Sequence, residues 1–481
     1  MKKIPAIIEL QEKFTSGELS VKEHTQKIIS EAKNSNKEFH HFNEICWEKA
    51  LQKAEELDRQ LKQKKAKGKL FGIPVSVKDC ICVKGVESTA GSAILKGYRP
   101  LYNATVIERA EKEGAIIIGK TAQDEFGFGT FSRNVGKGFE IPLNPHDKER
   151  SCGGSSGGSA GFTALTELTQ VSISESTGGS IACPASFCGV FGFTPTYGRV
   201  SRYGLMDYAS SLDKIGSMGK NVHDAALLLE AIAGNDEKDS TSLPNPVENY
   251  SQFLEKSPKG LKIGVVKEFF GKGIDKKVSE TVWKSLKMLE SEGAKIEEIS
   301  LPLNAEYGLS AYYLVAMTEA STNLAKYCGL RYGNALDLNG SFDEYFTKVR
   351  TEFFGEEAKR RIILGTFARM SGFREAYYLK AMKARTLLIE EFQKAFKKFD
   401  VLANPTMPVI APKFSEIEKL SPMQNYAMDL CTGPANTAGL PHASIPCGET
   451  SKMPVGLMLT ADYLKEKELL SASAFAEKVF K

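Results

Sequence analysis

Short apolar runs alternate with amphipathic helical stretches along most of this chain from residue 70 onward. The runs are rich in Val and Ile and have the length of buried β-strands. Because such strands need helices on both faces to cover them, the alternation predicts an α/β fold. The expected strands are residues 71–77, 115–118, 262–266, 400–403, 443–446 and 455–459, and the expected long helices are residues 276–293, 310–328 and 366–397.

The first 69 residues have the pattern of helices instead. Ser20 and Glu23 form a capping box at the start of one helix, and a second helix is expected from about residue 44 to residue 63. Residues 235–260, rich in Asn, Ser, Pro and Lys, are expected to be a surface excursion, because strands resume after them. We therefore predict one domain over residues 1–481, with a helical N-terminal portion at 1–69 and a core at 70–210.

Composition limits the class of protein. With 481 residues, 42% hydrophobic and 25% charged, the chain can bury a large core and is neither disordered nor fibrous. A net charge of +4, from 63 basic and 59 acidic residues, does not by itself indicate nucleic-acid binding. Nine cysteines without paired spacing predict reduced thiols, a cytoplasmic protein and no zinc site. Glu9 interrupts the first apolar run, and no stretch is long enough to predict a membrane span.

Two familiar motifs match in the wrong context. Residues 114–121 fit the phosphate-binding pattern G-x-x-x-x-G-K-T, but the residues between the two glycines are themselves an expected strand. Residues 153–157 fit G-x-S-x-G, but a polar turn and not a strand precedes them. The histidines that could serve such a serine are expected either on the surface, as His24, His40 and His41, or in structural roles, as His146 and His442.

Three segments carry residue types suited to nucleophilic catalysis without histidine. Lys78 ends an apolar strand, where burial disfavours the ammonium and can yield a neutral amine. Residues 152–159, Cys-Gly-Gly-Ser-Ser-Gly-Gly-Ser, combine serines with glycines that free the backbone. Ser180 directly follows two glycines whose N–H groups can face a developing oxyanion. Together they indicate a serine nucleophile activated by a lysine base.

An ordered set of segments that includes these three resembles the amidase signature family, over nearly the whole chain. The segments are residues 71–79, 119–126, 152–160, 177–181, 184–189 and 195–205. The resemblance implies a large mixed, twisted β-sheet that helices cover on both faces.

The resemblance also implies a Ser-Ser-Lys triad. Ser180 would be the nucleophile that forms an acyl-enzyme, and Ser155, placed at a cis peptide bond in the family, would relay its proton. Lys78, neutral at rest, would be the base. Backbone N–H groups from Thr177, Gly178 and Gly179 to Ser180 would form the oxyanion hole.

Within the family, the chain resembles the A subunits of the aspartyl/glutamyl-tRNA amidotransferases. Residues 195–205, 209–213, 355–361, 365–367 and 376–378 carry this likeness. In such subunits glutamine is hydrolysed to glutamate and ammonia. The resemblance implies that Arg361 holds the α-carboxylate of glutamine, that Asp429 takes its α-amino group, and that Tyr312 or Tyr313 lines the pocket.

This likeness also implies partners. A kinase/transferase-type B subunit would use the ammonia to convert Glu-tRNA(Gln) or Asp-tRNA(Asn), and a small C subunit would complete a heterotrimer. Charged tRNA would be met through the complex, with no membrane involved. Because this chain has no credible ATP site, ATP and Mg²⁺ are expected on the partner, and no cofactor or metal is expected here.

One stretch departs from the family. Where the family usually has D-T-G-G-S-I-R, residues 176–182 are Ser-Thr-Gly-Gly-Ser-Ile-Ala, so the acid and the arginine are missing. Two alternatives therefore stay open: a stand-alone amidase for small carboxamides, and a catalytically weakened scaffold subunit. The pair Arg361 and Asp429 distinguishes a glutamine-hydrolysing subunit from a stand-alone amidase, since an amino-acid amide needs both residues and a simple amide needs neither.

Overall fold

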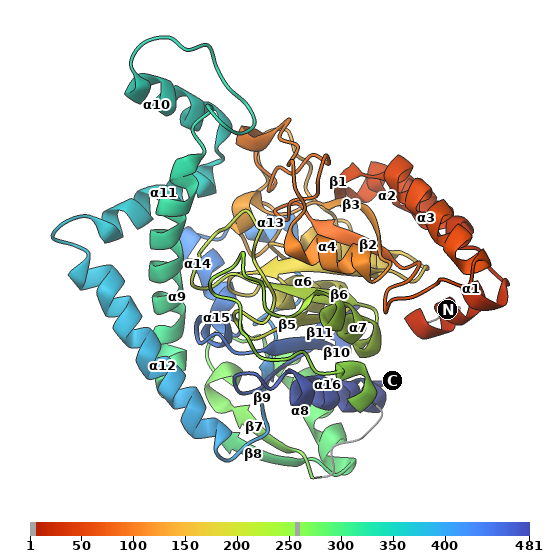
Figure 1. Ribbon diagram of the computed structural model, residues 1–481. Coiled ribbons are helices and arrows are strands. Elements are labelled where there is room, and N and C mark those ends of the chain that lie inside the picture. Colours follow the sequence, from red (N-terminus) through yellow and green to blue (C-terminus); the bar gives the residue numbers. More distant parts are fainter. Residues whose placement is uncertain (1–5, 255–259) are drawn as a thin grey trace.

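A mixed β-sheet organises the computed structural model, which describes residues 6–254 and 260–481 (Figure 1). Its eleven strands in this part of the chain run in the order β1-β3-β2-β4-β6-β5-β10-β11-β9-β7-β8. The strands are β1 (Phe42–Ile45), β2 (Pro74–Lys78), β3 (Ile116–Thr121), β4 (Val171–Ser176), β5 (Phe191–Thr194), β6 (Lys214–Gly219), β7 (Lys262–Val266), β8 (Lys295–Ile299), β9 (Val401–Pro405), β10 (His442–Thr450) and β11 (Met453–Thr460).

The helices pack on this sheet and beside it. They are α1 (Ile7–Ser16), α2 (Val21–Phe39), α3 (Trp47–Lys62), α4 (Thr105–Lys112), α5 (Gly157–Leu165), α6 (Ala182–Cys188), α7 (Val222–Ile232), α8 (Lys276–Ser291), α9 (Pro302–Asn323), α10 (Phe342–Phe353), α11 (Glu356–Arg369), α12 (Lys380–Phe396), α13 (Phe414–Ile417), α14 (Pro422–Ala427), α15 (Gly433–Thr437) and α16 (Glu466–Phe480). Figure 1 shows α9, α11 and α12 together on one side of the molecule, with α10 projecting beyond them. The predicted α/β class with a large mixed sheet is confirmed.

Strand pairing decides where the site lies. Strand β2 lies between β3 and β4 and pairs with both in parallel. Val77 of β2 lies opposite Ile173 of β4. Because parallel strands end at the same edge of a sheet, Lys78 at the end of β2 lies near the end of β4 and the loop that follows it. The hydrophobic core is continuous from the N-terminal helices, through Leu10 and Ile28, to these strands, so we retain one domain over 1–481 as a proposal.

Several predicted helices have different bounds. The helix expected at 310–328 is α9, which begins at Pro302 and ends at Asn323. The helix expected from residue 44 starts at Trp47, because Phe42–Ile45 adds to the sheet edge as β1, antiparallel to β3, and Phe42 packs on Phe162 at 4.8 Å between ring centroids. The helix expected at 366–397 is interrupted between α11 and α12, where Gly372 has a φ of +86° that a helix cannot accommodate. The hydrophobic periodicity correctly indicated a helix in each of these places. It could not show that residues 42–45 pair with the sheet or that Gly372 forms a left-handed turn.

The surface position expected for the N-terminal histidines is wrong for two of them. His24 and His41 are buried, and their Nε2 atoms lie 3.0 Å from the carbonyl oxygen of Thr169 and 2.9 Å from that of Leu143. Burial lowers the pKa of His41 to about 4, so it is neutral at pH 7. These contacts tie the helical N-terminal portion to the core, which sequence periodicity cannot reveal.

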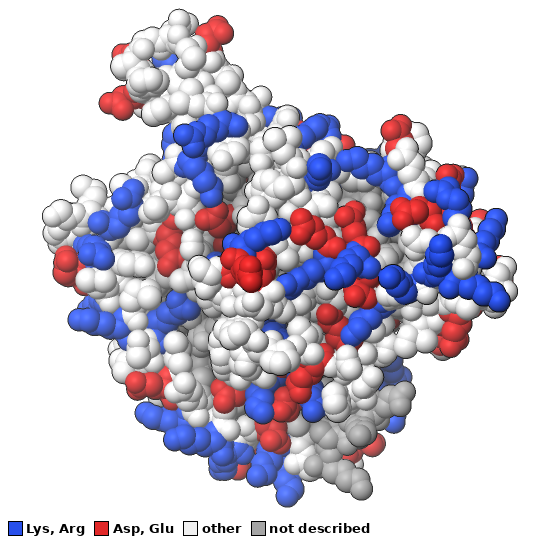
Figure 2. Space-filling view, viewed as in Figure 1, with Lys and Arg blue, Asp and Glu red and all other residues white. Residues whose placement is uncertain are grey.

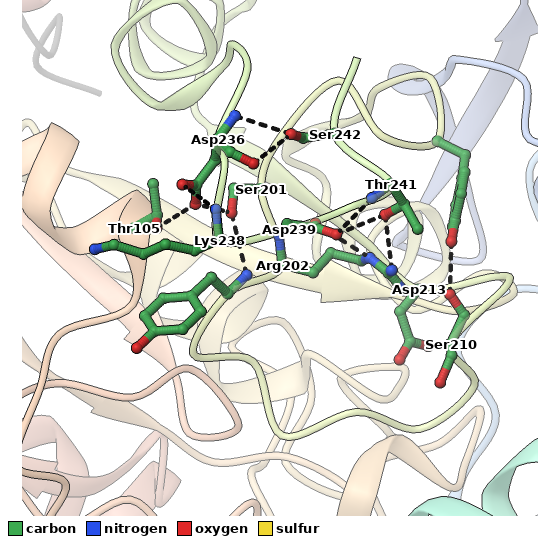
Figure 3. Close-up of polar contacts among 12 residues, drawn as sticks. Thr105, Ser201, Arg202, Ser210, Asp213, Asp236, Lys238, Asp239, Thr241 and Ser242 are labelled. Atoms are coloured by element: carbon green, nitrogen blue, oxygen red, sulfur yellow. Dashed lines mark hydrogen bonds and ion pairs between the residues drawn. The ribbon is translucent and has the colours of Figure 1, made fainter. Parts of the chain in front are cut away.

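The excursion expected at 235–260 is anchored at its start by acidic side chains (Figure 3). Asp236 accepts hydrogen bonds from Ser201 and Thr105, each at 2.6 Å, and Asp239 accepts one at 2.8 Å from the backbone N–H of Arg202. The loop is therefore fixed to the segment that leads to Asp213. Residues 255–259 of the excursion lie outside the described residues.

Three general features complete the description of residues 6–254 and 260–481. None of the helices there has the length and hydropathy needed to cross a bilayer. No group of three or more His, Cys, Asp or Glu residues in these ranges is placed to hold a metal ion. All nine cysteines are free thiols.

Candidate active site

Lys78 is completely buried at the end of β2, and its side-chain nitrogen has three oxygen neighbours. Lys78 Nζ lies 2.7 Å from Ser155 Oγ, 3.0 Å from the carbonyl oxygen of Glu175 and 2.8 Å from Glu175 Oε2. The predicted base and the predicted relay are therefore in direct contact, although 77 residues separate them in the sequence. The contact suits proton transfer between Ser155 and Lys78.

The glycines around Ser155 are required by close contacts. A Cβ on Gly153 would lie 2.8 Å from Pro184 Cα, and one on Gly154 would lie 2.1 Å from Asp124 Oδ2. The peptide bond between Gly154 and Ser155 is cis, as the family resemblance implies. The run at 152–159 is thus a tightly packed elbow before α5 and not a linker.

Ser180 stands in the turn between β4 and α6, with 6% of its surface exposed. The elbow and this turn are neighbours, because Ser156 Oγ donates to the carbonyl oxygen of Glu175 at 3.1 Å and Gly153 packs against Pro184 in α6. The three triad candidates therefore belong to one buried region. Their catalytic roles remain predictions.

The residues predicted to form the oxyanion hole are in close contact with side chains from other parts of the fold. A Cβ on Gly178 would lie 2.6 Å from the Tyr312 hydroxyl oxygen, and one on Gly179 would lie 2.4 Å from Thr432 Oγ1. The carbonyl oxygen of Thr177 accepts a hydrogen bond from the Asn436 side chain. Only glycine allows α9 to approach the turn this closely, so Tyr312 lies directly beside the candidate oxyanion hole.

Arg361 projects from α11 into an aromatic box. Its guanidinium donates to Glu357 Oε1 at 2.8 Å and to the Tyr208 hydroxyl at 2.5 Å. The rings around it are those of Phe128, Tyr208, Tyr313 and Tyr426, with centroids 5.1–5.5 Å from the guanidinium carbon. A fixed, buried guanidinium of this kind can hold a carboxylate by two parallel hydrogen bonds.

Asp429 is the acidic counterpart in the same region. It accepts a hydrogen bond from the Tyr313 hydroxyl at 2.5 Å and one from Thr130 Oγ1 at 3.3 Å. Burial raises the pKa of Asp429 to about 6, so the carboxylate is ionised at pH 7. Tyr313 thus touches Asp429, whereas Tyr312 faces the turn at Gly178; the two tyrosines have different neighbours.

A cavity of about 480 Å³ opens onto Arg361. Its other lining residues include Thr130, Glu357 and Tyr426, and a small amino acid fits this volume. The triad candidates lie beyond the segment 129–130, because the backbone N–H of Gly154 donates to the carbonyl oxygen of Thr130 at 2.7 Å. The cavity therefore lies beside Arg361, with segment 129–130 between it and the triad candidates.

Several residues of this site were not predicted from the sequence. They are Thr130, Glu175, Tyr208, Glu357 and Tyr426. The spacing of Glu357 and Arg361, four residues apart in a helix, was a usable signal for one of them. For Glu175 the local indication was weaker: it is an acidic residue within β4, a strand in which all six residues are buried.

Glu125 is a buried carboxyl that supports the start of α11. It accepts hydrogen bonds from Ser92 Oγ at 2.5 Å and from the backbone N–H of Gly355 at 2.9 Å, and burial raises its pKa to about 7. The folded state therefore binds more protons than the unfolded state between about pH 4.5 and 7, so Glu125 makes stability fall as pH rises through this range. In Glu125→Gln we expect the unfolding free energy to change less between pH 4.5 and 7 than in the native protein. The difference between the two changes should be at most about 3 kcal/mol.

Thermal or denaturant unfolding at several pH values measures this difference. Glu290→Gln, on the exposed face of α8, is the control and should leave the profile unchanged. A parallel profile for Glu125→Gln and the native protein would contradict the assignment.

Comparison with known proteins adds independent information. The family model described as Amidase matches residues 23–470. The chain is 45% identical to the A subunit of glutamyl-tRNA(Gln) amidotransferase from a Cyanothece strain, over 98% of this chain and 97% of that protein. It is also 45% identical to the protein of the same name from Caldanaerobacter subterraneus subsp. tengcongensis, over 98% of this chain and 96% of that protein.

A solved structure agrees with these relatives. The crystal structure of the A subunit of glutamyl-tRNA(Gln) amidotransferase from Thermotoga maritima is 34% identical in sequence and superposes with a TM-score of 0.77, over 94% of this chain and 91% of that one. The similarity thus extends across the sheet and the helices that carry the site.

Proposed function

This chain belongs to the amidase family, and from that premise we propose that it is the glutamine-hydrolysing A subunit of a tRNA-dependent amidotransferase. Its reaction is hydrolysis of the side-chain amide of glutamine to glutamate and ammonia. The observation that carries the choice of glutamine is the pairing of two opposite charges, Arg361 and Asp429, in one buried region near the contact between Lys78 and Ser155.

The chemistry follows from the contacts around Lys78. Ser180 Oγ attacks the amide carbon while its proton passes to Ser155 and the Ser155 proton passes to Lys78. Backbone N–H groups of Gly178 and Gly179 stabilise the oxyanion. The proton returns to the departing nitrogen, ammonia leaves, and water hydrolyses the acyl-enzyme to release glutamate.

Substrate selection depends on the two ends of the amino acid. Arg361 binds the α-carboxylate, and the ionised Asp429 binds the α-ammonium group. Tyr312, which packs directly on Gly178, would line the pocket near the oxyanion hole. A simple carboxamide lacks both charged groups, so it would leave Arg361 and Asp429 without partners and would bind weakly.

The ammonia would be used by a kinase/transferase-type B subunit, and a small C subunit would complete the heterotrimer. The B subunit would activate Glu-tRNA(Gln) or Asp-tRNA(Asn) with ATP and Mg²⁺ and amidate it. The names of the relatives as subunits support an assembly. On the viewed face, Lys and Arg are interspersed with Asp and Glu (Figure 2), which favours tRNA binding through the complex over binding by this face alone.

An exposed apolar surface on α11, α12 and the turn between them also supports an assembly. Its side chains are Ile363, Leu364, Phe367, Met370, Phe373, Tyr377 and Leu387, each between 38% and 68% exposed. Clusters of this kind on a folded protein mark contacts with other chains. We assign this surface to the partner subunits of the amidotransferase.

The test compares two substrates with protein purified from its native host together with any subunits that accompany it. We expect ammonia release from glutamine and little release from acetamide. Turnover of acetamide with none of glutamine would refute the proposal in favour of a stand-alone amidase. If native protein, alone and with its partners, formed no covalent adduct at Ser180 with an acylating glutamine analogue, a scaffold subunit would be the better description.

A further inference from the structure

Glu175 is a buried carboxyl that touches the candidate base directly. It is 3% exposed, in β4, and its Oε2 atom lies 2.8 Å from Lys78 Nζ. The Ser155 hydroxyl occupies another side of the same nitrogen at 2.7 Å. Lys78 thus stands between a carboxyl group and the relay serine.

A second buried carboxyl is connected to Glu175 through one hydroxyl. Thr177 Oγ1 lies 2.8 Å from Glu175 Oε1 and 2.8 Å from Asp213 Oδ1. A hydroxyl carries one hydrogen, so it can donate to only one of these oxygens. In the remaining contact the Thr177 oxygen must accept a hydrogen bond, so the carboxyl group on that side must be protonated. The group formed by Lys78, Glu175, Thr177 and Asp213 therefore holds one carboxyl proton in addition to the protons on Lys78.

Asp213 is the better site for that extra proton. Burial, and then the charge of Glu175, raises the pKa of Asp213 well above its usual range. In this arrangement Asp213 donates to Thr177, and Thr177 donates to Glu175. Asp213 is held in place by backbone N–H groups: Tyr208 donates to Oδ2 at 2.8 Å, and Ala209 donates to both Oδ1 and Oδ2 at 3.0 Å.

We propose that Glu175 accepts a proton from Lys78, so that Lys78 can act as the base without releasing a proton to solvent. Glu175 is then a positioning residue that acts through Lys78. The inference rests on the proposed amide hydrolysis, but it concerns a residue that the triad does not include.

The proton count balances within the cluster. One proton moves from Lys78 Nζ to Glu175 Oε2, which leaves a neutral amine with a free electron pair. That pair takes the Ser155 proton as Ser155 takes the Ser180 proton and Ser180 Oγ bonds to the amide carbon, whose π electrons move to the carbonyl oxygen. As the carbonyl re-forms and the C–N bond breaks, its electron pair stays on nitrogen, which takes the relayed proton from Lys78 through Ser155 and leaves as ammonia. Lys78 then regains its proton from Glu175, and water hydrolyses the acyl-enzyme through the same relay.

Other titratable and charged groups face this pair from neighbouring elements. They are Asp79 and Cys80 after β2, Lys120 in β3, Asp124 after β3, and Asp213 with Arg202 before β6. Burial raises the pKa of Asp124 to about 6, so Asp124 changes charge near the acidic end of a rate profile. The ratio of native to variant rates at each pH removes the contribution that both proteins share.

The test is Glu175→Gln in the complex as purified, with kcat for glutamine measured from about pH 6 to pH 9. Gln can accept a hydrogen bond from Lys78 but cannot accept its proton, so Lys78 must then lose that proton to solvent. We expect the native-to-variant ratio of kcat to rise as pH falls from 9 to 6, by up to about tenfold per pH unit, with KM unchanged. Glu175→Asp, which keeps a carboxyl group, should restore part of the loss at low pH.

Two results would overturn the proposal. A ratio that is the same at every pH would mean that Glu175 only supports the structure. A variant faster than the native protein at low pH would mean that Glu175 only holds Lys78 as an ammonium ion.

A second variant tests the proposal if Glu175→Gln does not fold. Thr177→Val keeps the backbone N–H and removes the hydroxyl that donates to Glu175, which raises the proton affinity of Glu175. We therefore expect a native-to-variant ratio of kcat at or below 1 at pH 6, and a ratio that rises well above 1 as pH falls would contradict the proton transfer to Glu175. If native protein does not hydrolyse glutamine, the proposed function fails, and the same pH ratio measured with acetamide still tests Glu175.

Discussion

Ser180→Ala is expected to lower kcat for ammonia release from glutamine by about 10⁴-fold or more. The substitution removes the oxygen that would form the acyl-enzyme and leaves the surrounding fold in place, since Ser180 is in a turn and is slightly exposed. KM should change little, because the charged ends of glutamine bind elsewhere. A steady-state ammonia assay measures the loss, and mass spectrometry should show no adduct with an acylating glutamine analogue.

A matched serine in α6 provides the control. Ser186 is also buried, and its Oγ accepts a hydrogen bond from the backbone N–H of Gly456 at 3.1 Å. Ser186→Ala should keep activity within a few-fold of the native value while losing some stability. Lys78→Ala should reduce kcat nearly as much as Ser180→Ala, because Ser155 then has no base. Retained activity in either triad variant would refute the triad.

Arg361→Ala is expected to lower kcat/KM for glutamine by about 10²- to 10³-fold, mainly through KM. The reason is the loss of a buried guanidinium, which would leave the α-carboxylate without a partner. Arg361→Lys keeps the charge but loses the planar fork, and its effect should be intermediate. Kinetics with glutamine and with acetamide, in parallel, separate substrate binding from chemistry.

Asp429 should show the complementary behaviour. Its carboxylate is present above about pH 6 and is lost as pH falls through that value, so KM of the native protein for glutamine should rise below pH 6. Asp429→Asn should have a high KM at all pH values. Equal losses for glutamine and acetamide in the Arg361 and Asp429 variants would contradict substrate binding and favour a structural role.

Strand prediction was reliable where Val and Ile dominate a short run. The run around Val75 gave β2, and the one at residues 262–266 gave β7 with the same bounds. β4 was not predicted from its own pattern, because its Ser and Glu residues alternate with Val and Ile although all six are buried. Their burial depends on partners in other strands: Ser172 Oγ, for example, donates to the carbonyl oxygen of Ser76 at 3.3 Å.

The sequence by itself determined the α/β class, the strand-end position of Lys78 and Ser180 after two glycines as a candidate, since short-range periodicity and glycine spacing record local backbone needs. The choice of Ser155 within residues 152–159 came from the family resemblance. Only the tertiary structure brought Glu175 to Lys78, across 97 residues, and Tyr208 to Arg361, across 153 residues. The physical reason is that these contacts depend on the order in which strands pair and on how α11 packs beside them. Neither leaves a periodic signal in the chain, so the surroundings of the base and of the arginine became visible only in the folded protein.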